Sequence, residues 1–103
     1  MTDKEFWEKC GFEYLHHSYA DRAIYATPDG STWIEERDFP PVDLNNLFKY
    51  AVPKLTDPDI QFFQLDNGSW EVSIEYKSIH LTGADKDPAI ALKKAIEQVW
   101  EER

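Results

Sequence analysis

Histidine and cysteine are the residues of this sequence best suited to hold a metal ion. The chain has three histidines and one cysteine, namely His16, His17, His80 and Cys10. Adjacent residues of a strand point to opposite faces, so His16 and His17 are not expected to reach one ion together. A zinc site would have to combine Cys10 and His80 with one of them, and no HxH, HxxxH or CxxC spacing is present. We therefore predict no metal site and no cofactor.

Cys10 is also the candidate nucleophile of the sequence. It would need a nearby base and an electropositive pocket to react as a thiolate. It follows a short predicted helix, whose C-terminal dipole disfavours a thiolate. We interpret Cys10 as a small buried side chain on the same helix face as Phe6. A single cysteine excludes an internal disulfide and fits a reducing compartment.

Carboxylates could supply acid–base chemistry or calcium ligands at three places: Glu35–Glu36 with Asp38, Asp57 with Asp59, and Glu71 with Glu75. A calcium loop needs several oxygens at fixed spacing around a turn glycine, which these groups lack. Glu71 and Glu75 alternate with apolar residues and belong to the solvated face of a predicted strand. The sequence also lacks phosphate-binding glycine loops and a Gly-x-Ser-x-Gly motif. We predict a protein that is not an enzyme and has no catalytic residues.

Aromatic residues make up 15% of the chain and could form a binding surface. Trp and Tyr contribute strongly at protein interfaces, but in a chain of 103 residues most of them are expected in the core. A core or an interface position stays open for Trp33, Trp70, Tyr76 and Trp100.

The charge balance limits the partners. Twenty acidic residues against 11 basic ones give a formal net charge of −9. This argues against binding to nucleic acid or to an anionic membrane, both of which require clustered basic residues. We expect an unknown protein partner, and a homodimer through a sheet edge or an aromatic patch is compatible with the sequence. Two alternatives are an acidic mimic of nucleic acid that blocks a host defence protein, and a small-ligand pocket lined by Trp, Tyr and His.

Three helices are predicted to position these residues. A capping box formed by Thr2 and Glu5 begins a helix over residues 3–10. Asp43 caps a second helix that runs to residue 55, with a kink or frayed turn at Pro53. Its apolar face consists of Leu44, Leu47, Phe48, Ala51 and Leu55. Asp87 caps a third helix, on which Lys93, Lys94, Glu97, Gln98 and Glu101 form the polar face.

Strands are predicted over residues 12–19, 23–27, 31–36, 60–65, 69–77 and 79–82. Gly30 and Gly68 provide the turns of two hairpins. Trp follows each turn glycine closely, as "DGSTW" and "NGSW", which is an echo between the two halves. Because no long linker is present, we predict a single α+β domain over residues 1–103, with antiparallel hairpins packed against three helices.

Several stretches resemble the phage ABA sandwich domain family. They are "DLNNLFKYAVPKL" (43–55), "DKDPAIALKKAIEQVWEE" (85–102) with its Asp-Pro-Ala opening, the W-x-V-x-I strand at 70–74 and the N-terminal pattern "MTDKEFW". The resemblance implies packed α and β layers and a phage or prophage accessory protein, with no assigned catalytic residues to carry over. The N-terminus lacks a signal-peptide h-region, and no apolar run has the length of a membrane span, so we expect a bacterial cytoplasmic location.

Overall fold

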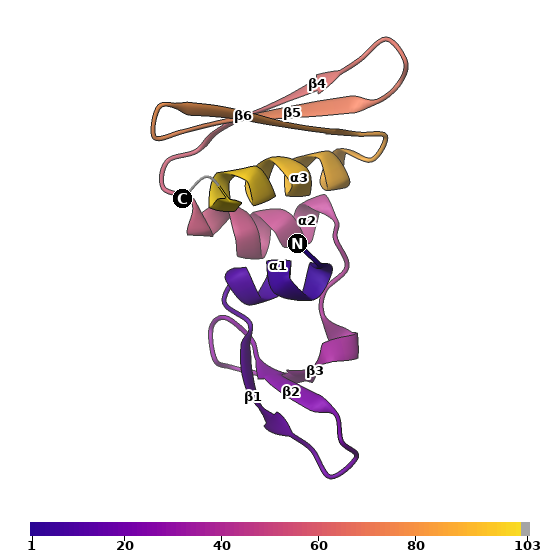
Figure 1. Ribbon diagram of the computed structural model, residues 1–103, viewed down its shortest axis with the longest axis vertical. Coiled ribbons are helices and arrows are strands. Elements are labelled where there is room, and N and C mark those ends of the chain that lie inside the picture. The colour runs from indigo at the N-terminus through magenta and orange to yellow at the C-terminus, as the bar shows by residue number, and fades with distance from the viewer. Residues whose placement is uncertain (102–103) are drawn as a thin grey trace. The chain divides into compact units, whose positions relative to one another are not determined.

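The computed structural model describes residues 1–101, which form two three-stranded antiparallel sheets and three α-helices (Figure 1). The predicted α+β class is confirmed. The chain divides into two compact units, the first covering Met1–Pro41 and the second beginning at Val42. One domain over residues 1–103 stays a prediction. Within residues 1–101, no helix has the length and apolar character needed to cross a membrane.

The first unit consists of a helix, a three-stranded meander and a short 3-10 helix: α1 (Asp3–Lys9), β1 (Glu13–His17), β2 (Ala23–Ala26), β3 (Trp33–Glu35) and η1 (Glu36–Asp38). The predicted capping box is confirmed. Thr2 Oγ1 accepts a hydrogen bond from the Glu5 amide at 3.1 Å, and Glu5 Oε1 accepts one from the Thr2 amide at 3.0 Å. Gly30 closes the β2–β3 hairpin with a φ of 74°, a value that favours glycine.

The two faces of the first sheet differ. A bulge in β1 between Tyr14 and His16 puts Tyr14 and His17 on one face, where the Tyr14 hydroxyl lies 2.6 Å from His17 Nδ1. The Tyr25 ring belongs to this face and packs against Tyr14 and Phe39, at centroid distances of 5.7 and 4.8 Å. This face therefore contributes to the core. The opposite face is half-buried or exposed and carries His16, Ile24, Trp33 and Glu35.

The second unit begins with a helical stretch that changes its winding: α2 (Leu44–Asn46), the π-turn segment η2 (Leu47–Ala51) and the 3-10 segment η3 (Val52–Lys54). Asp43 Oδ1 accepts a hydrogen bond from the Asn46 amide at 2.8 Å, which confirms the predicted cap. Pro53 explains the change in winding, because its ring cannot fit against the carbonyl four residues earlier in an α-helix. The prediction was wrong for Phe48, which is 46% exposed and is not part of the core.

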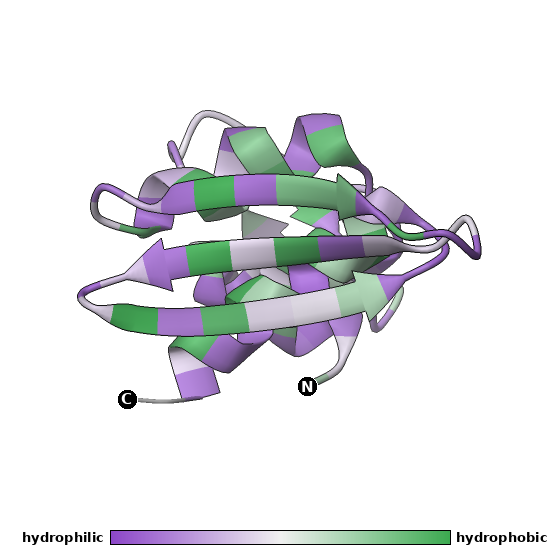
Figure 2. Ribbon diagram, turned by 90° about the horizontal axis from the view of Figure 1, so that it is seen from above, coloured by the Kyte–Doolittle hydropathy of each residue, from purple (hydrophilic) through white to green (hydrophobic). Residues whose placement is uncertain are grey.

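The second sheet is a meander of β4 (Asp59–Gln64), β5 (Trp70–Tyr76) and β6 (Ile79–Asp85). Figure 2 shows hydrophobic and hydrophilic residues alternating along β5 and along the first half of β4, where they are followed by two consecutive phenylalanines. Val72 lies opposite Phe62 on β4 and opposite Gly83 on β6, so these three residues share a face. β6 extends beyond the predicted end at residue 82, because the turn residues Lys77 and Ser78 adopt positive φ values and the full length of β6 pairs with β5.

Helix α3 (Pro88–Glu101) covers the face of the second sheet that carries Gly83. A Cβ on Gly83 would lie 2.6 Å from the Ala95 nitrogen and 2.9 Å from Lys94 Cβ, so only glycine permits this approach. Asp87 caps the helix as predicted, accepting a hydrogen bond from the Ala89 amide at 2.8 Å. The polar-face prediction was wrong for Lys93, which is 8% exposed. Its ammonium group pairs with Glu97 at 3.2 Å, which offsets the cost of burying the charge.

Candidate functional site

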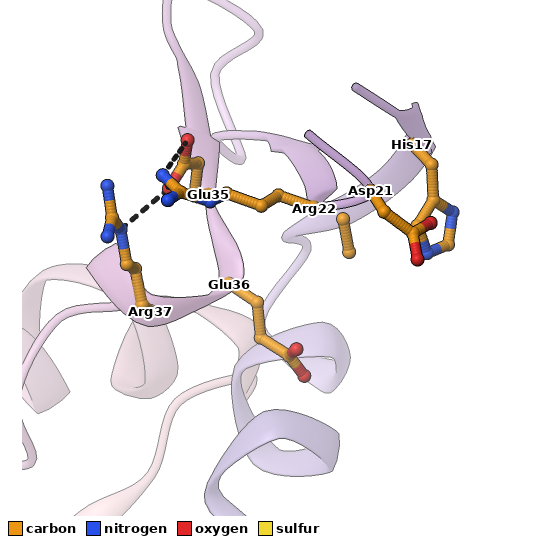
Figure 3. A pocket seen from close by; sticks show the side chains of 7 residues that line it. His17, Asp21, Arg22, Glu35, Glu36 and Arg37 are labelled. Atoms are coloured by element: carbon orange, nitrogen blue, oxygen red, sulfur yellow. Dashed lines mark hydrogen bonds and ion pairs between the residues drawn. The ribbon is translucent and has the colours of Figure 1, made fainter. Parts of the chain in front are cut away.

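A hollow of about 300 Å³ lies beside the first sheet (Figure 3). Its lining is mostly charged, which distinguishes it from a typical apolar ligand pocket. The lining residues are His17, Asp21, Arg22, Ala23, Glu35, Glu36 and Arg37.

Glu35 is the centre of the charged cluster in this hollow. Arg22 Nη1 lies 3.2 Å from Glu35 Oε2 and 3.3 Å from Oε1, and Arg37 Nε lies 2.6 Å from Oε2. The carboxylate is one-quarter exposed, whereas both guanidinium groups are more open to solvent. One carboxylate therefore fixes two arginines at the surface, and both retain further N–H groups that can donate to a ligand or a partner.

The hairpin of β2 and β3 explains how residues far apart in sequence meet here. Ile24 pairs with Glu35 across the two strands. Arg22 precedes Ile24 by two residues, and Arg37 follows Glu35 by two residues. The pairing therefore puts Arg22, which lies just before β2, near Glu35 at the end of β3. Arg37 reaches the same carboxylate from η1, which follows β3 directly.

Glu36 is not part of the charged cluster around Glu35. Its side chain points away from the Arg22–Glu35–Arg37 cluster (Figure 3) and lies 3.6 Å from Lys4 Nζ. Because Glu35 and Glu36 each have their own cationic neighbour, they do not form the close pair of carboxylates that shared acid–base work requires. Asp38, the third predicted residue of this group, lies in η1.

A second shallow hollow follows the open face of the first sheet. Its lining includes His16, Ile24, Trp33 and Arg37. Trp33 is 68% exposed, and its ring meets the His16 ring edge-on at a centroid distance of 6.3 Å. The open face of the first sheet thus combines an exposed indole with the charged cluster around Glu35.

The predicted ligand residues are dispersed. His16 and His17 lie on opposite faces of β1, as their contacts with Trp33 and Tyr14 show. His80 lies on β6 in the second unit, and Cys10 is buried at the end of α1. Among residues 1–101, no group of three His, Cys, Asp or Glu residues is placed to hold a metal ion.

Ser73 and His80 form a contact that resembles a nucleophile and its base. Ser73 Oγ lies 3.2 Å from His80 Nε2, on the face of the second sheet away from α3. Within the described chain, no carboxylate is hydrogen-bonded to His80, and Ser73 is only 7% exposed. Without an orienting group the contact is a cross-strand hydrogen bond rather than a catalytic pair.

The remaining candidates lie in the second unit. Asp57 adopts a φ of 47° in the turn before β4, and Asp59 is the first residue of that strand. Glu71 and Glu75 lie on the outer face of β5, as predicted, directly opposite Phe63 and Asp59. Of the other aromatic candidates, Tyr76 is buried, and Trp70 and Trp100 are half-buried.

The sequence reasoning missed Arg22 and Arg37. Neither belongs to a motif, and each is 13 residues or fewer from Glu35 in a chain with many charges. The signal was nonetheless present, since continuing the hairpin register outward from the Ile24–Glu35 pair puts Arg22 opposite Arg37, two residues beyond Glu35.

The fold and the site define a small α+β protein with an open surface of charged and aromatic side chains. No protein-family model, curated protein or solved structure matches the chain. The resemblance to the phage ABA sandwich domain family therefore stays a prediction.

Proposed function

We propose that the chain is a protein-binding accessory protein without enzymatic activity, of the phage or prophage kind, acting in the bacterial cytoplasm. The observation that carries protein binding is Trp33, 68% exposed on the open face of the first sheet. Trp and Arg are the residue types concentrated at the energetic centres of interfaces. Arg22 and Arg37, held by Glu35, provide a polar rim beside this aromatic anchor. The phage origin and the compartment rest on the sequence resemblance and on the single cysteine.

The test compares two variants in pull-downs from a bacterial lysate. Trp33→Ala removes the exposed indole, and Ile79→Ala removes a 41% exposed side chain from the second sheet. We expect a host protein that is retained by the natural chain and by Ile79→Ala but lost with Trp33→Ala. Truncating a central interface tryptophan typically costs 2 kcal/mol or more, about a thirtyfold loss of affinity. Capture that is insensitive to Trp33→Ala would contradict the proposal.

A second candidate function is the binding of a small anionic ligand. The observation that favours it is the 300 Å³ hollow in which Arg22 and Arg37 converge on one carboxylate. A ligand carboxylate or phosphate would accept the remaining guanidinium N–H groups. A thermal-shift screen of nucleotides and organic acids tests it, because a ligand at a hundredfold its Kd stabilises by about 2.7 kcal/mol. A screen without shifts, or shifts unchanged by Arg37→Gln, would contradict this candidate.

A further inference from the structure

Strand β4 forms an open edge of the second sheet. It pairs with β5 along its whole length and is the last strand on that side. Within residues 1–101, β4 has no hydrogen bond or ion pair beyond its pairing with β5. An edge strand of this kind presents unpaired N–H and C=O groups that another strand can use. β4 also lacks lysine, proline and a bulge, the usual features that prevent such pairing.

The opposite edge, β6, is closed by α3. Gln98 Nε2 donates a hydrogen bond to the Thr82 carbonyl at 2.6 Å, and Lys94 Nζ donates one to the Ala84 carbonyl at 3.2 Å. Thr82 and Ala84 are two residues apart, so their carbonyls point the same way. Side chains of the helix thus occupy acceptors that an added strand would need. Of the two edges, β4 is the one available for pairing.

An aromatic shelf, formed by Phe48 and Phe62, borders the open edge on the helix side of the sheet. The two rings stack at a centroid distance of 6.5 Å and an interplanar angle of 30°. Their residues are 46% and 36% exposed. Phe62 shares its face with Val72 and Gly83, which faces α3, so the shelf lies on that side of the sheet. Every second side chain of an added strand would point toward this shelf, which selects apolar residues there.

The outer side of the same edge is acidic. The outward-facing residues of β4 and β5 include no Lys or Arg; they are Asp59, Gln61, Phe63, Glu71, Ser73 and Glu75. Asp59 and Glu75 lie directly opposite each other, so their like charges are close together. A basic side chain on an added strand would relieve this repulsion. At the positions that do not face the Phe48–Phe62 shelf, an added strand is therefore expected to carry Lys or Arg.

We propose that the β4 edge binds an extended segment of a partner protein in which apolar residues alternate with Lys or Arg. Main-chain hydrogen bonds to β4 hold the segment, its apolar side chains contact the Phe48–Phe62 shelf, and its basic side chains contact Asp59 and Glu75. A second copy of this chain fits less well, because β4 contains no basic residue and would add its own Asp59 to the acidic face. The surface belongs to the second unit and does not include Trp33, so it can be tested independently of the proposed function.

The probe is a synthetic peptide of about eight residues in which lysine and valine alternate, a length that matches a typical strand. It is titrated into the full chain, and backbone amides are followed by NMR. We expect shifts concentrated at residues 59–65 and slower hydrogen exchange at β4 amides. Added salt should weaken binding, because the outer contacts are between exposed charges. A peptide of the same composition with its lysines grouped together should bind at least about tenfold more weakly.

Two controls separate strand addition from simple charge attraction. A peptide methylated at alternate backbone nitrogens keeps its charge but cannot donate to β4, and it should lose binding. Glu75→Lys should weaken the unmodified peptide about tenfold, whereas Glu8→Lys, the same charge change on α1, should have little effect. Equal binding of the methylated peptide, or shifts that leave β4 and the Phe48–Phe62 shelf unchanged, would overturn the proposal. A dimer in sedimentation experiments without peptide, together with β4 amides that exchange slowly in that dimer, would assign the edge to a second copy of the chain. That result would also overturn the proposal.

Discussion

The two edge strands of the second sheet belong to a single antiparallel meander, yet they differ in what contacts their outer backbone groups. At β6, a glycine lets α3 approach the strand, and two helix side chains then reach strand carbonyls. At β4, Phe62 stacks on Phe48 at the border of the strand, and no other part of residues 1–101 is hydrogen-bonded to its outer backbone groups. The difference between the two edges therefore depends on the packing partner: α3 reaches the carbonyls of β6, which Gly83 allows, whereas within the described chain no helix side chain is hydrogen-bonded to β4. β4 and β6 each contain a single charged residue, Asp59 and Asp85 respectively, so by charge alone the two strands look equally able to pair.

Of the changes that test this comparison, Gly83→Ala should cause the largest loss of stability, because the added methyl group forces β6 away from α3. The added methyl group would meet backbone atoms of α3, which cannot move aside as a flexible side chain can. We expect the free energy of unfolding in urea to fall by about 3 kcal/mol. The control is Ala84→Val, which adds atoms to the exposed outer face of the same strand and should change stability by about 0.5 kcal/mol or less. A loss for Gly83→Ala as small as for the control would mean that α3 does not press on β6.

Gln98→Ala should have a moderate effect by removing one of the two donors at the β6 edge. The Thr82 carbonyl then loses a hydrogen bond of 2.6 Å, and we expect a loss of about 1 kcal/mol in urea unfolding. Gln98→Glu keeps the size of the side chain but replaces the donor with an acceptor, so it should be at least as destabilising. Stability unchanged in both variants would show that the amide does not close this edge.

Of the three changes, acidification should lower the free energy of unfolding least, and it acts through the carboxyl group of Asp85. The amide of Asp87, and secondarily Lys94, hold the pKa of the Asp85 carboxyl below its ordinary value. Because the folded pKa is depressed, this contribution to stability is complete above the ordinary carboxyl pKa of about 4 and is lost as the pH falls through the lower folded value. Carbon-13 NMR of the Asp85 carboxyl carbon as a function of pH measures this folded-state pKa. Lys94→Met should raise that pKa only in part, since the Asp87 amide remains; a full return to the ordinary value would contradict this order of causes.

Much of the fold could be predicted because its determinants are local. The turn glycines Gly30 and Gly68 adopt the positive φ values expected of them, and the alternation of residues in β5 identifies its two faces correctly. Asp43 and Asp87 cap the helices that they were predicted to cap. The echo between the two turn sequences, however, does not fall at equivalent places. The Gly30 turn joins β2 to β3, the last two strands of its meander, whereas the Gly68 turn joins β4 to β5, the first two of its own.

The failures of prediction concern tertiary packing. Lys93 lies on the polar face by helical periodicity, but it is buried and pairs with Glu97 one turn later. Phe48 follows the apolar periodicity of its helix, yet its side chain stays exposed and stacks on the ring of Phe62. Whether such a side chain is covered depends on neighbours that periodicity does not specify. The candidate site shows the same limit, because Trp33 was identified as a residue type but its exposure required the structure.

The closure of β6 by α3 has a consequence for stoichiometry. A sheet with two open edges can add strands at both sides and grow without end, which is the geometry of fibrils. In the second sheet only β4 can accept a strand, and Gln98 and Lys94 terminate the other side. Each chain therefore offers one place, the β4 edge, at which a segment can pair directly with this sheet. At most one segment per chain is in direct contact with the second sheet.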